Sequence, residues 1–325
     1  VESVPEKLFN FIGPYVDSIN GQPKYAPFGL RKVEAVLKRA HGNDVAIAHP
    51  LHLEQFIGHD TEIVGVYTMD PLGLGPVSLM FTAGGQLTAY TKQRFLQLMQ
   101  AINEIREHKQ LRFKLIVGGP GVWELEYRPH MIDELKIDHL IYGEVEHVIV
   151  DLLNEIRENK KDQKIIRVKS FPTVDQILPM TGPSMEGLVE VMRGCGRGCA
   201  FCEVTLRATR FMPFDMLTHE ISLNVHAGYS HVFAHSDDIF MYKCENHRTM
   251  QPNADAIIEL FQHIMNVPGV GSSNATHGTL AGVLADPAMM ETLSAVLKAG
   301  PNNWIGLQVG LETGSATLAK KIMPL

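Results

Sequence analysis

Three of the four cysteines in this chain stand within one short run. Cys195, Cys199 and Cys202 lie in the sequence RGCGRGCAFC, which begins at Arg193, and the fourth cysteine is Cys244. A disulfide scaffold would spread cysteines in pairs along the chain. The crowding therefore predicts metal or cluster ligation in a reducing compartment.

Thiolates at this spacing favour an iron–sulfur cluster. A cubane cluster normally takes four cysteine ligands, so three on one loop would leave one iron free to bind and activate a small molecule. The intervening glycines permit the tight turns that wrapping around a cluster requires. The alternative is a zinc site of three cysteines and one histidine, with His219 or His226 as the fourth ligand. Cys244 is expected to be a buried, inert thiol.

The elements that must position these residues alternate between strand and helix. Short apolar runs predict strands in the N-terminal half at 7–12, 45–49, 62–67, 113–117 and 138–142. Apolar residues at helical spacing predict helices among them at 28–37, 95–105 and 148–157. This pattern predicts an α/β fold with a parallel sheet covered on both faces. We expect a flavodoxin-like doubly wound domain over residues 1–158, with its ligand crevice at the carboxyl ends of the strands.

A second alternating series follows a polar, proline-bearing linker that is expected over residues 159–186. It predicts strands at 188–192, 231–235, 270–275 and 304–309, with helices at 216–227, 255–265 and 289–298. Four strand–helix repeats over residues 187–325 predict a partial (β/α) barrel. Because a six-stranded partial barrel needs two more strands, we expect the native chain to continue beyond Leu325. Since the first residue is a valine, we also expect the sequence to be a fragment of a longer chain.

The cysteine run has gaps of three and two residues and an aromatic residue before its last cysteine, and it resembles that of the radical S-adenosylmethionine enzymes. In that family three thiolates hold a 4Fe–4S cluster, S-adenosylmethionine chelates the fourth iron, and reductive cleavage yields a 5′-deoxyadenosyl radical. The resemblance implies that Cys195, Cys199 and Cys202 are the cluster ligands. It implies contacts to S-adenosylmethionine from Phe201 (adenine), Asp237 and Asp238 (the methionine amino group), Ser272 and Asn274 (ribose), and Glu312 in the run GLETG.

A doubly wound domain ahead of this barrel resembles the cobalamin-binding radical S-adenosylmethionine proteins, called class B, and the likeness covers nearly the whole chain. The turns GGPG at 118–121 and GEVE at 143–146 match the ends of that family's fourth and fifth strands. The nucleotide tail of cobalamin would lie against these turns, because backbone without side chains permits close approach. The implied cobalamin contacts are Asp70, Leu72, Gly73, Gly118, Gly119, Gly121, Gly143 and Glu144.

The sequence does not identify a residue that would ligate the cobalt of cobalamin. The sequence has no Asp-x-His-x-x-Gly, the pattern by which other cobalamin proteins supply a histidine to cobalt. His49, His52 and His59 have the wrong spacing and are expected to be surface histidines. The loop 68–73 is the candidate surface beneath the corrin, and a weakly ligated lower face would suit methyl transfer.

The resemblance implies a cobalamin-dependent C-methyltransferase that acts on an unactivated carbon, with cobalamin as the methyl carrier. The subgroup that the chain resembles contains archaeal enzymes that C-methylate a residue, a glutamine, of methyl-coenzyme M reductase. The implied partners are this protein or a small metabolite as substrate, and an electron donor such as ferredoxin or flavodoxin.

Three other functions compete with this interpretation. A methylthiotransferase shares the barrel but carries N-terminal cysteines for a second cluster, and the first 194 residues of this chain contain none. A cobalamin-dependent radical enzyme that performs a rearrangement or a cyclisation stays open. So does a non-catalytic zinc or iron–sulfur binding module.

Composition narrows the partners further. With 29 Lys and Arg against 36 Asp and Glu, the net charge is −7, which argues against nucleic acid as a partner. No run approaches the roughly 18 apolar residues of a membrane-spanning helix, and the N-terminus lacks a signal pattern. We therefore expect no membrane partner and a cytoplasmic location.

Overall fold

The computed structural model describes residues 5–244, 246 and 251–323, and it divides into two compact units. Unit 1 comprises Val1–Tyr25 and Val36–Pro172, and unit 2 comprises Ala26–Ala35 and Thr173–Leu325. Each unit contains a parallel sheet with helices packed on it, so the expected α/β class is confirmed.

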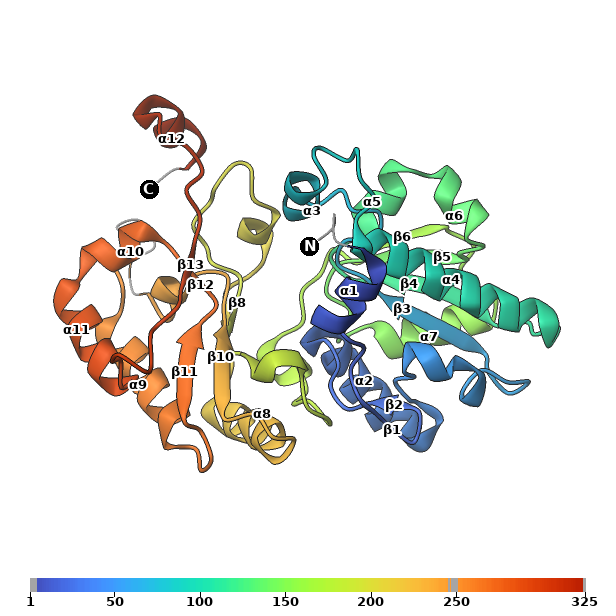
Figure 1. The fold of residues 1–325 in the computed structure, drawn as a ribbon, viewed down its shortest axis with the longest axis horizontal. Coiled ribbons are helices and arrows are strands. Elements are labelled where there is room, and N and C mark those ends of the chain that lie inside the picture. Colours follow the sequence, from blue (N-terminus) through green and yellow to red (C-terminus); the bar gives the residue numbers. More distant parts are fainter. Residues whose placement is uncertain (1–4, 245, 247–250, 324–325) are drawn as a thin grey trace. The chain divides into compact units, whose positions relative to one another are not determined.

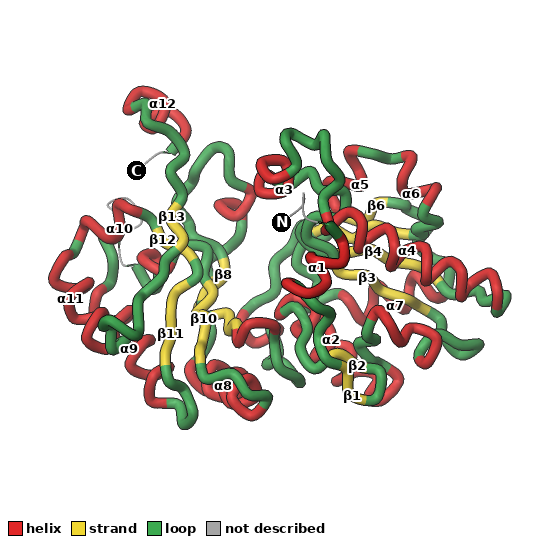
Figure 2. The backbone as a smooth tube through the Cα atoms, in the orientation of Figure 1, coloured by secondary structure: helices red, strands yellow, loops and turns green. Residues whose placement is uncertain are grey.

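Unit 1 is built on a four-stranded parallel sheet. Hydrogen bonds join its strands in the order β3 (Ile63–Tyr67), β4 (Lys114–Gly118), β5 (His139–Tyr142) and β6 (Ile165–Arg167). Alternate residues of β4 face opposite sides: Leu115 and Val117 belong to one buried cluster and Ile116 to another. Helix α4 (Tyr90–His108) packs on the first side and α7 (Ile149–Arg157) on the second (Figures 1 and 2). The expectation of a parallel sheet with both faces covered is confirmed.

The first two expected strands are wrong. Residues 7–12 belong to helix α1 (Glu6–Ile12), on which Phe9 stacks against Tyr90 with ring centroids 3.9 Å apart. A short apolar run does not distinguish strand from helix by periodicity alone. Residues 45–49 form no strand, and the backbone N–H of His49 donates to the Gly21 carbonyl instead. Within the described residues the strand order therefore follows the chain, without the reversal of a flavodoxin-like sheet.

Short elements connect the sheet of unit 1. They are the hairpin β1 (Ser18–Ile19) and β2 (Gln22–Pro23), the 3₁₀ turns η1 (Gly42–Asp44) and η2 (Pro50–Gln55), and the helices α3 (Pro76–Phe81), α5 (Val122–Tyr127) and α6 (His130–Glu134). The stretch 159–186, expected to be a linker, contains β6 and the turns η3 (Val174–Gln176) and η4 (Met185–Gly187). Strand β6 has only three residues, too few for a periodic signal.

Helix α2 (Phe28–His41) begins among residues that group with unit 2. The reason is a set of buried polar contacts: Lys32 forms an ion pair with Glu220 of unit 2, and Arg31 donates to the Pro183 carbonyl at 3.1 Å. Sequence patterns do not reveal this grouping, because it depends on partners about 150 to 190 residues away in the chain.

Unit 2 contains a three-stranded parallel sheet in the order β11 (Ser272–Ala275), β10 (His231–His235) and β7 (Leu188–Glu190). Helices α8 (Phe214–His226), α9 (Ala254–Asn266) and α11 (Pro287–Val296) contribute to one apolar core with Val189, Val232 and Ala234. The strand expected at 231–235 has these bounds in the structure, and the other strands and helices expected in this half overlap observed ones.

Two shorter ladders extend unit 2. Strand β8 (Met192–Arg193) pairs antiparallel with β9 (Arg210–Phe211), and β12 (His277–Gly278) pairs parallel with β13 (Gln308–Val309). The strand expected at 304–309 is thus only two residues long. The remaining elements are η5 (Glu203–Leu206), η6 (Ile239–Met241), α10 (Leu280–Ala285) and α12 (Ala316–Ile322). Among the described residues, no helix is both long and apolar enough to cross a bilayer.

Candidate functional site

The three clustered cysteines lie on a loop of unit 2, the cysteine loop (Gly194–Cys202). The antiparallel ladder of β8 and β9 closes its base, pairing Arg193 with Arg210. Gly194 has φ +76°, and a Cβ there would lie 2.8 Å from the Ala208 carbonyl oxygen, so glycine is required at this turn. The expected role of the glycines as sites of tight turns agrees with this geometry.

Two carboxylates at the end of β10 hold the cysteine loop. The backbone N–H of Gly194 donates to Oδ2 of Asp237 at 2.8 Å. Arg197, within the loop, donates from Nη1 to Oδ2 of Asp238 at 3.1 Å. The structure therefore places both aspartates beside the cysteines, as the strand-end position predicts, and gives each a partner within the protein.

Asp238 is nearly fully buried. Its Oδ2 also accepts a hydrogen bond from Thr279 at 3.2 Å, and its Oδ1 accepts from the Phe240 N–H at 3.2 Å as the N-cap of η6. Burial raises the pKa of Asp238, and the Arg197 guanidinium opposes that rise. Sequence reasoning missed Arg197 and Thr279; the one available signal was an arginine standing between two cysteines.

The three thiols are unpaired with one another as disulfides and lie close enough to interact. Cys195 is buried, and Cys199 and Cys202 are half-buried. Burial raises the pKa of Cys195, and the charges of Asp237 and Cys202 add to the rise. Burial likewise raises the pKa of Cys199, with Cys202 adding and Arg197 opposing. In the part of the chain that the structure describes, no three His, Cys, Asp or Glu side chains are already arranged to hold a metal ion.

The C-terminal segment also reaches the cysteine loop. Glu312 is exposed, and its charge raises the pKa of Cys199, so the carboxylate lies near that thiol. The Ala200 N–H donates to the Ile322 carbonyl of α12 at 2.8 Å. Phe201, the aromatic residue before the last cysteine, is half exposed. The structure thus brings Phe201 and Glu312 to the loop, and their contacts with a cofactor stay predictions.

The two residues predicted at the ribose lie elsewhere on the sheet. Ser272 is the first residue of β11, not the end of the strand, and its Oγ bonds to Nδ1 of His231 at 2.7 Å. The expectation that Ser272 ends a strand is therefore wrong. Asn274 is the third of the four residues of β11, opposite Phe233 of β10, and is buried. The contacts of both residues with the ribose stay predictions.

A buried charge pair lies directly before the cysteine loop. Arg193 donates to both carboxylate oxygens of Glu190, at 2.8 and 2.9 Å. Burial alone would raise the pKa of Glu190, but the Arg193 guanidinium lowers it to about 2. His235, opposite Glu190 in the register, bonds through Nδ1 to Thr276 at 3.2 Å, and burial lowers its pKa. Sequence reasoning gave these residues no role, although two charges three positions apart in an apolar run were a signal.

In unit 1 the glycines follow the strands as expected, and the backbone of a neighbouring loop approaches each of them closely. Gly119 has φ +103°, and a Cβ there would lie 2.5 Å from the Thr68 carbonyl oxygen. A Cβ on Gly121 would lie 2.5 Å from the Met69 backbone, and one on Gly143 would lie 2.2 Å from the Val168 carbonyl oxygen. Neighbouring loops at the carboxyl edge of the sheet thus pack backbone against backbone. The structure thus gives a packing reason for these glycines, and their contact with a nucleotide tail stays a prediction.

The loop after β3, the β3–α3 loop (Asp70–Gly75), lies beside these glycines. Leu72 is buried in the core, and Gly73 has φ +70° with its Cβ position 2.6 Å from Ala89. Asp70 accepts hydrogen bonds from the Gly75 N–H at 2.8 Å and from Thr91 at 3.2 Å. Its carboxylate is therefore engaged within the protein. Of the other predicted contacts, Gly118 is the last residue of β4 and Glu144 is the second residue after β5.

The histidines near the second expected strand are not all on the surface. His49 is buried: Nε2 bonds to the Val16 carbonyl at 2.9 Å and Nδ1 accepts from the Leu51 N–H at 3.1 Å. The prediction that His49 is a surface residue is wrong, and both of its ring nitrogens have protein partners. His52 bonds to Ser18 at 3.0 Å on the surface. Neither arrangement supports a histidine ligand for cobalt.

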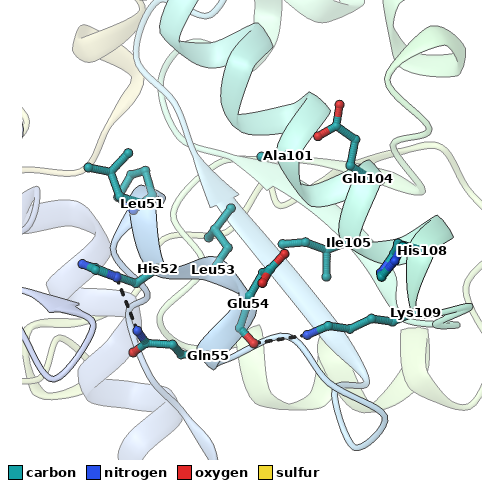
Figure 3. A pocket seen from close by; sticks show the side chains of 11 residues that line it. Leu51, His52, Leu53, Glu54, Gln55, Ala101, Glu104, Ile105, His108 and Lys109 are labelled. Atoms are coloured by element: carbon teal, nitrogen blue, oxygen red, sulfur yellow. Dashed lines mark hydrogen bonds between the residues drawn. The ribbon is translucent and has the colours of Figure 1, made fainter.

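A cavity of about 630 Å³ lies at the opposite edge of unit 1 (Figure 3). It is lined by η2 and the C-terminal turns of α4, including His52, Glu104 and His108. Lys109 closes one end by donating to the Glu54 and Ile57 carbonyls at 3.2 and 3.0 Å. Because η2 precedes β3 and α4 precedes β4, this cavity lies at the amino ends of the strands. It includes no predicted site residue.

The side chains at these sites can be compared with the cofactors that the sequence implies, namely an iron–sulfur cluster or zinc, and cobalamin. Three thiols on one glycine-rich loop fit an iron–sulfur cluster with three protein ligands. In the alternative zinc site, His219 bonds through Nε2 to the Met180 carbonyl at 3.1 Å and His226 through Nδ1 to the Ser222 carbonyl at 2.6 Å, which leaves the other ring nitrogen of each as the one that would bind a metal. For cobalamin, exposed apolar side chains gather on and after the β3–α3 loop, and they fit a large, partly apolar ring system. These side chains are Met69, Val77, Met80 and Phe81.

Comparison with known proteins gives partial matches. No family model matches the chain. Curated relatives are named tRNA-2-methylthio-N(6)-dimethylallyladenosine synthase. The one from Actinobacillus pleuropneumoniae serotype 5b (strain L20) is 25% identical over 162 residues, covering 48% of this chain and 33% of the relative. The one from Phocaeicola vulgatus (strain ATCC 8482) is 22% identical over 158 residues, covering 47% and 34%. The chain thus spans about a third of the length of these relatives.

Among solved structures, the apo form of the cobalamin-dependent S-adenosylmethionine radical enzyme OxsB is similar to this chain. The match covers 98% of this chain and 56% of that one, with a TM-score of 0.48 and 13% sequence identity.

Proposed function

We propose that this chain is a cobalamin-dependent radical S-adenosylmethionine enzyme that transfers a methyl group to an unactivated carbon. The observation that carries the proposal is the cysteine loop. Three thiols stand on a loop anchored by Asp237 and Asp238 at the carboxyl end of a parallel strand, and the charge of Cys202 acts on both Cys195 and Cys199. Ligands of α/β folds bind at this end of the strands.

The chain's own residues would hold and orient the cofactors. Cys195, Cys199 and Cys202 would bind a 4Fe–4S cluster, while Asp237 holds the first residue of the loop that carries them and Asp238 holds Arg197 within it. Phe201 and Glu312 are the proposed contacts to S-adenosylmethionine. When bound, the cluster supplies an electron for cleavage of S-adenosylmethionine, and cobalamin carries the methyl group.

Unit 1 would bind the cobalamin. The β3–α3 loop and the turns after β4 and β5 lie at the carboxyl edge of its sheet, and the exposed apolar side chains from Met69 to Phe81 lie beside them. The substrate is proposed to be a protein residue, such as a glutamine of methyl-coenzyme M reductase, or a small metabolite. The electron donor is proposed to be a ferredoxin or flavodoxin.

A second candidate function is suggested by the curated relatives, whose name describes a methylthio group on tRNA. The composition opposes it, because the first 194 residues contain no cysteine and the net charge is −7. Cobalt in the purified protein separates the two functions, and so does the mass of the product.

The test is anaerobic reconstitution with iron, sulfide and hydroxocobalamin, followed by desalting and metal analysis. We expect about four irons and about one cobalt per chain, with cleavage of S-adenosylmethionine under reducing conditions. Iron without cobalt would overturn the methyl-transfer proposal and leave the radical barrel. Cobalt with a product of unchanged mass would favour rearrangement or cyclisation. Zinc without iron and without cleavage would favour a binding module.

A further inference from the structure

A buried glutamate lies beneath the β3–α3 loop of unit 1. Glu124, on α5, has no exposed surface, and its Oε2 accepts hydrogen bonds from the backbone N–H groups of Leu72 at 2.7 Å and Leu74 at 3.4 Å. Neither of these amides belongs to a regular element. The side chain of Glu124, which follows the next strand, thus accepts hydrogen bonds from two backbone amides of this loop.

The other oxygen of Glu124 has no donor. Oε1 is buried and no hydrogen-bond donor reaches it. A buried carboxylate oxygen without a donor is costly, whereas a protonated carboxyl group can itself donate. The acceptor at hand is the carboxylate of Asp70, which lies close enough to Glu124 to raise the pKa of Glu124. Glu124 is therefore best satisfied as a neutral acid that accepts through Oε2 and donates toward Asp70.

Asp70, in contrast to Glu124, is surrounded by hydrogen-bond donors that favour its ionised form. It accepts from the Gly75 N–H at 2.8 Å, from the Ser78 hydroxyl and from Thr91 at 3.2 Å. Burial raises the pKa of Asp70, but these bonds and the one to Glu124 outweigh it and lower the pKa. Burial and Asp70 raise the pKa of Glu124 to about 8. The two carboxyl groups thus share one proton near neutral pH, as adjacent carboxyls at other sites do.

The pair joins elements that approach one another at the carboxyl edge of the sheet. Glu124 comes from α5, and Asp70 binds the first turns of α3 and α4 through Ser78 and Thr91. Those partners from α3 and α4 are hydroxyls, so Asp70 is the ionised group that faces Glu124 from the loop. The backbone crowding of Gly121 against Met69 holds the same loop from the other side.

We propose that Glu124, as a neutral acid paired with Asp70, is a positioning residue that sets the shape of the β3–α3 loop and with it the surface that receives cobalamin. The inference rests on the proposed function for its ligand, but not for its geometry. Ionisation of Glu124 would place two negative charges side by side and release the loop. The order that the neutral acid gives the loop is therefore fully present below the ordinary glutamate pKa of 4.5, falls as the pH rises, and is gone above about 8.

The experiment uses the full chain and two readouts. Hydrogen exchange at the amides of Leu72 and Leu74, corrected for intrinsic rates, reports loop order without any ligand. Retention of hydroxocobalamin after desalting reports whether the proposed cobalamin-binding surface is intact. In the wild type, both should fall as the pH rises from 6 to 8, by about tenfold in protection per pH unit, and level off above the pKa of Glu124, where the group is ionised whether or not the loop is ordered.

Glu124→Gln is the decisive variant, because an amide accepts and donates in the same places but does not ionise. Its loop protection and cobalamin retention should be independent of pH between 6 and 9. Glu124→Ala should lose protection at every pH, and Glu126→Gln, two positions along the same helix but partly exposed, should behave as the wild type. Circular dichroism and the fluorescence of Trp123 check that each variant is folded.

Identical pH profiles in the wild type and Glu124→Gln would overturn the inference. If loop protection follows the expected pattern but no variant retains cobalamin, the positioning role stands and the proposed function fails. If cobalamin is retained equally by all variants at all pH values, the proposed function stands and the positioning role fails.

Discussion

The β3–α3 loop of unit 1 and the cysteine loop of unit 2 both lie beside the carboxyl ends of parallel strands, but they are held in different ways. The β3–α3 loop is fixed by backbone crowding and by amides that bind Glu124. The first half of the cysteine loop is fixed by charged side chains, Asp237 on Gly194 and Asp238 on Arg197. Cys195 lies between these two anchors and Cys199 and Cys202 follow them, and among the described residues no three His, Cys, Asp or Glu side chains are arranged to hold a metal ion.

The difference matches what each loop is proposed to bind. A large preformed ligand such as cobalamin requires a surface whose shape exists beforehand, and close backbone packing supplies it. A cluster assembled in place can draw its ligands together, because binding free energy orders the loop. Shape in unit 1 and charge in unit 2 should therefore be the sensitive features, and three substitutions test this contrast.

The largest effect is expected from removing a thiol. Cys199→Ala leaves two protein ligands and should reduce the iron bound after reconstitution from about four per chain to near zero. Cleavage of S-adenosylmethionine should be lost, while cobalt retention in unit 1 is unchanged. The matched control is Cys244→Ser, whose hydroxyl can replace the thiol bond to the Gln251 carbonyl and which should keep the full iron content. Formation of 5′-deoxyadenosine by Cys199→Ala would disprove the ligand assignment.

The next effect tests charge in unit 2. Arg193→Ala leaves the Glu190 carboxylate buried without its guanidinium, which should lower the free energy of unfolding by about 3–5 kcal/mol. Chemical denaturation in a Trp123→Phe background, where Trp304 of unit 2 is the remaining tryptophan, measures it. The control is Arg157→Ala in unit 1, followed by Trp123 in a Trp304→Phe background, since its pair with Glu62 is exposed and should contribute no more than about 1 kcal/mol. Equal losses in the two variants would mean that the buried pair does not stabilise unit 2.

The smallest effect tests shape in unit 1. Gly119→Ala adds a Cβ 2.5 Å from the Thr68 carbonyl oxygen at a positive φ, and should cost about 1–3 kcal/mol. It should also weaken cobalamin retention and spare the iron content. Gly118→Ala is the neighbouring control, because its Cβ would meet only the Ile141 carbonyl oxygen at 3.8 Å. Denaturation followed by Trp123 in a Trp304→Phe background distinguishes them, and indistinguishable midpoints would remove the shape argument.

Much of the fold could be predicted from patterns in the chain. Long amphipathic runs gave α4, α7 and α9 to within a few residues, and the apolar strands β3, β4 and β10 likewise. The failures were short segments: residues 7–12 became a helix because Phe9 stacks on Tyr90, and β6 was missed because it has three residues. A short apolar run is too short to show a helical or strand periodicity, so its contacts in the folded protein decide which secondary structure it adopts.

The site divides in the same way. Sequence alone determined the three clustered thiols, the glycines that follow the strands and the aspartates that end β10, because spacing along the chain is enough to specify a ligand set or a turn. Only the tertiary structure decided which other residues contact these groups, such as Arg197 with Asp238 and Glu124 with the loop that contains Asp70. It also decided that Ser272 lies at the amino end of its strand. These contacts join residues about 40 to 50 positions apart, and register and packing, which no local pattern encodes, bring them together.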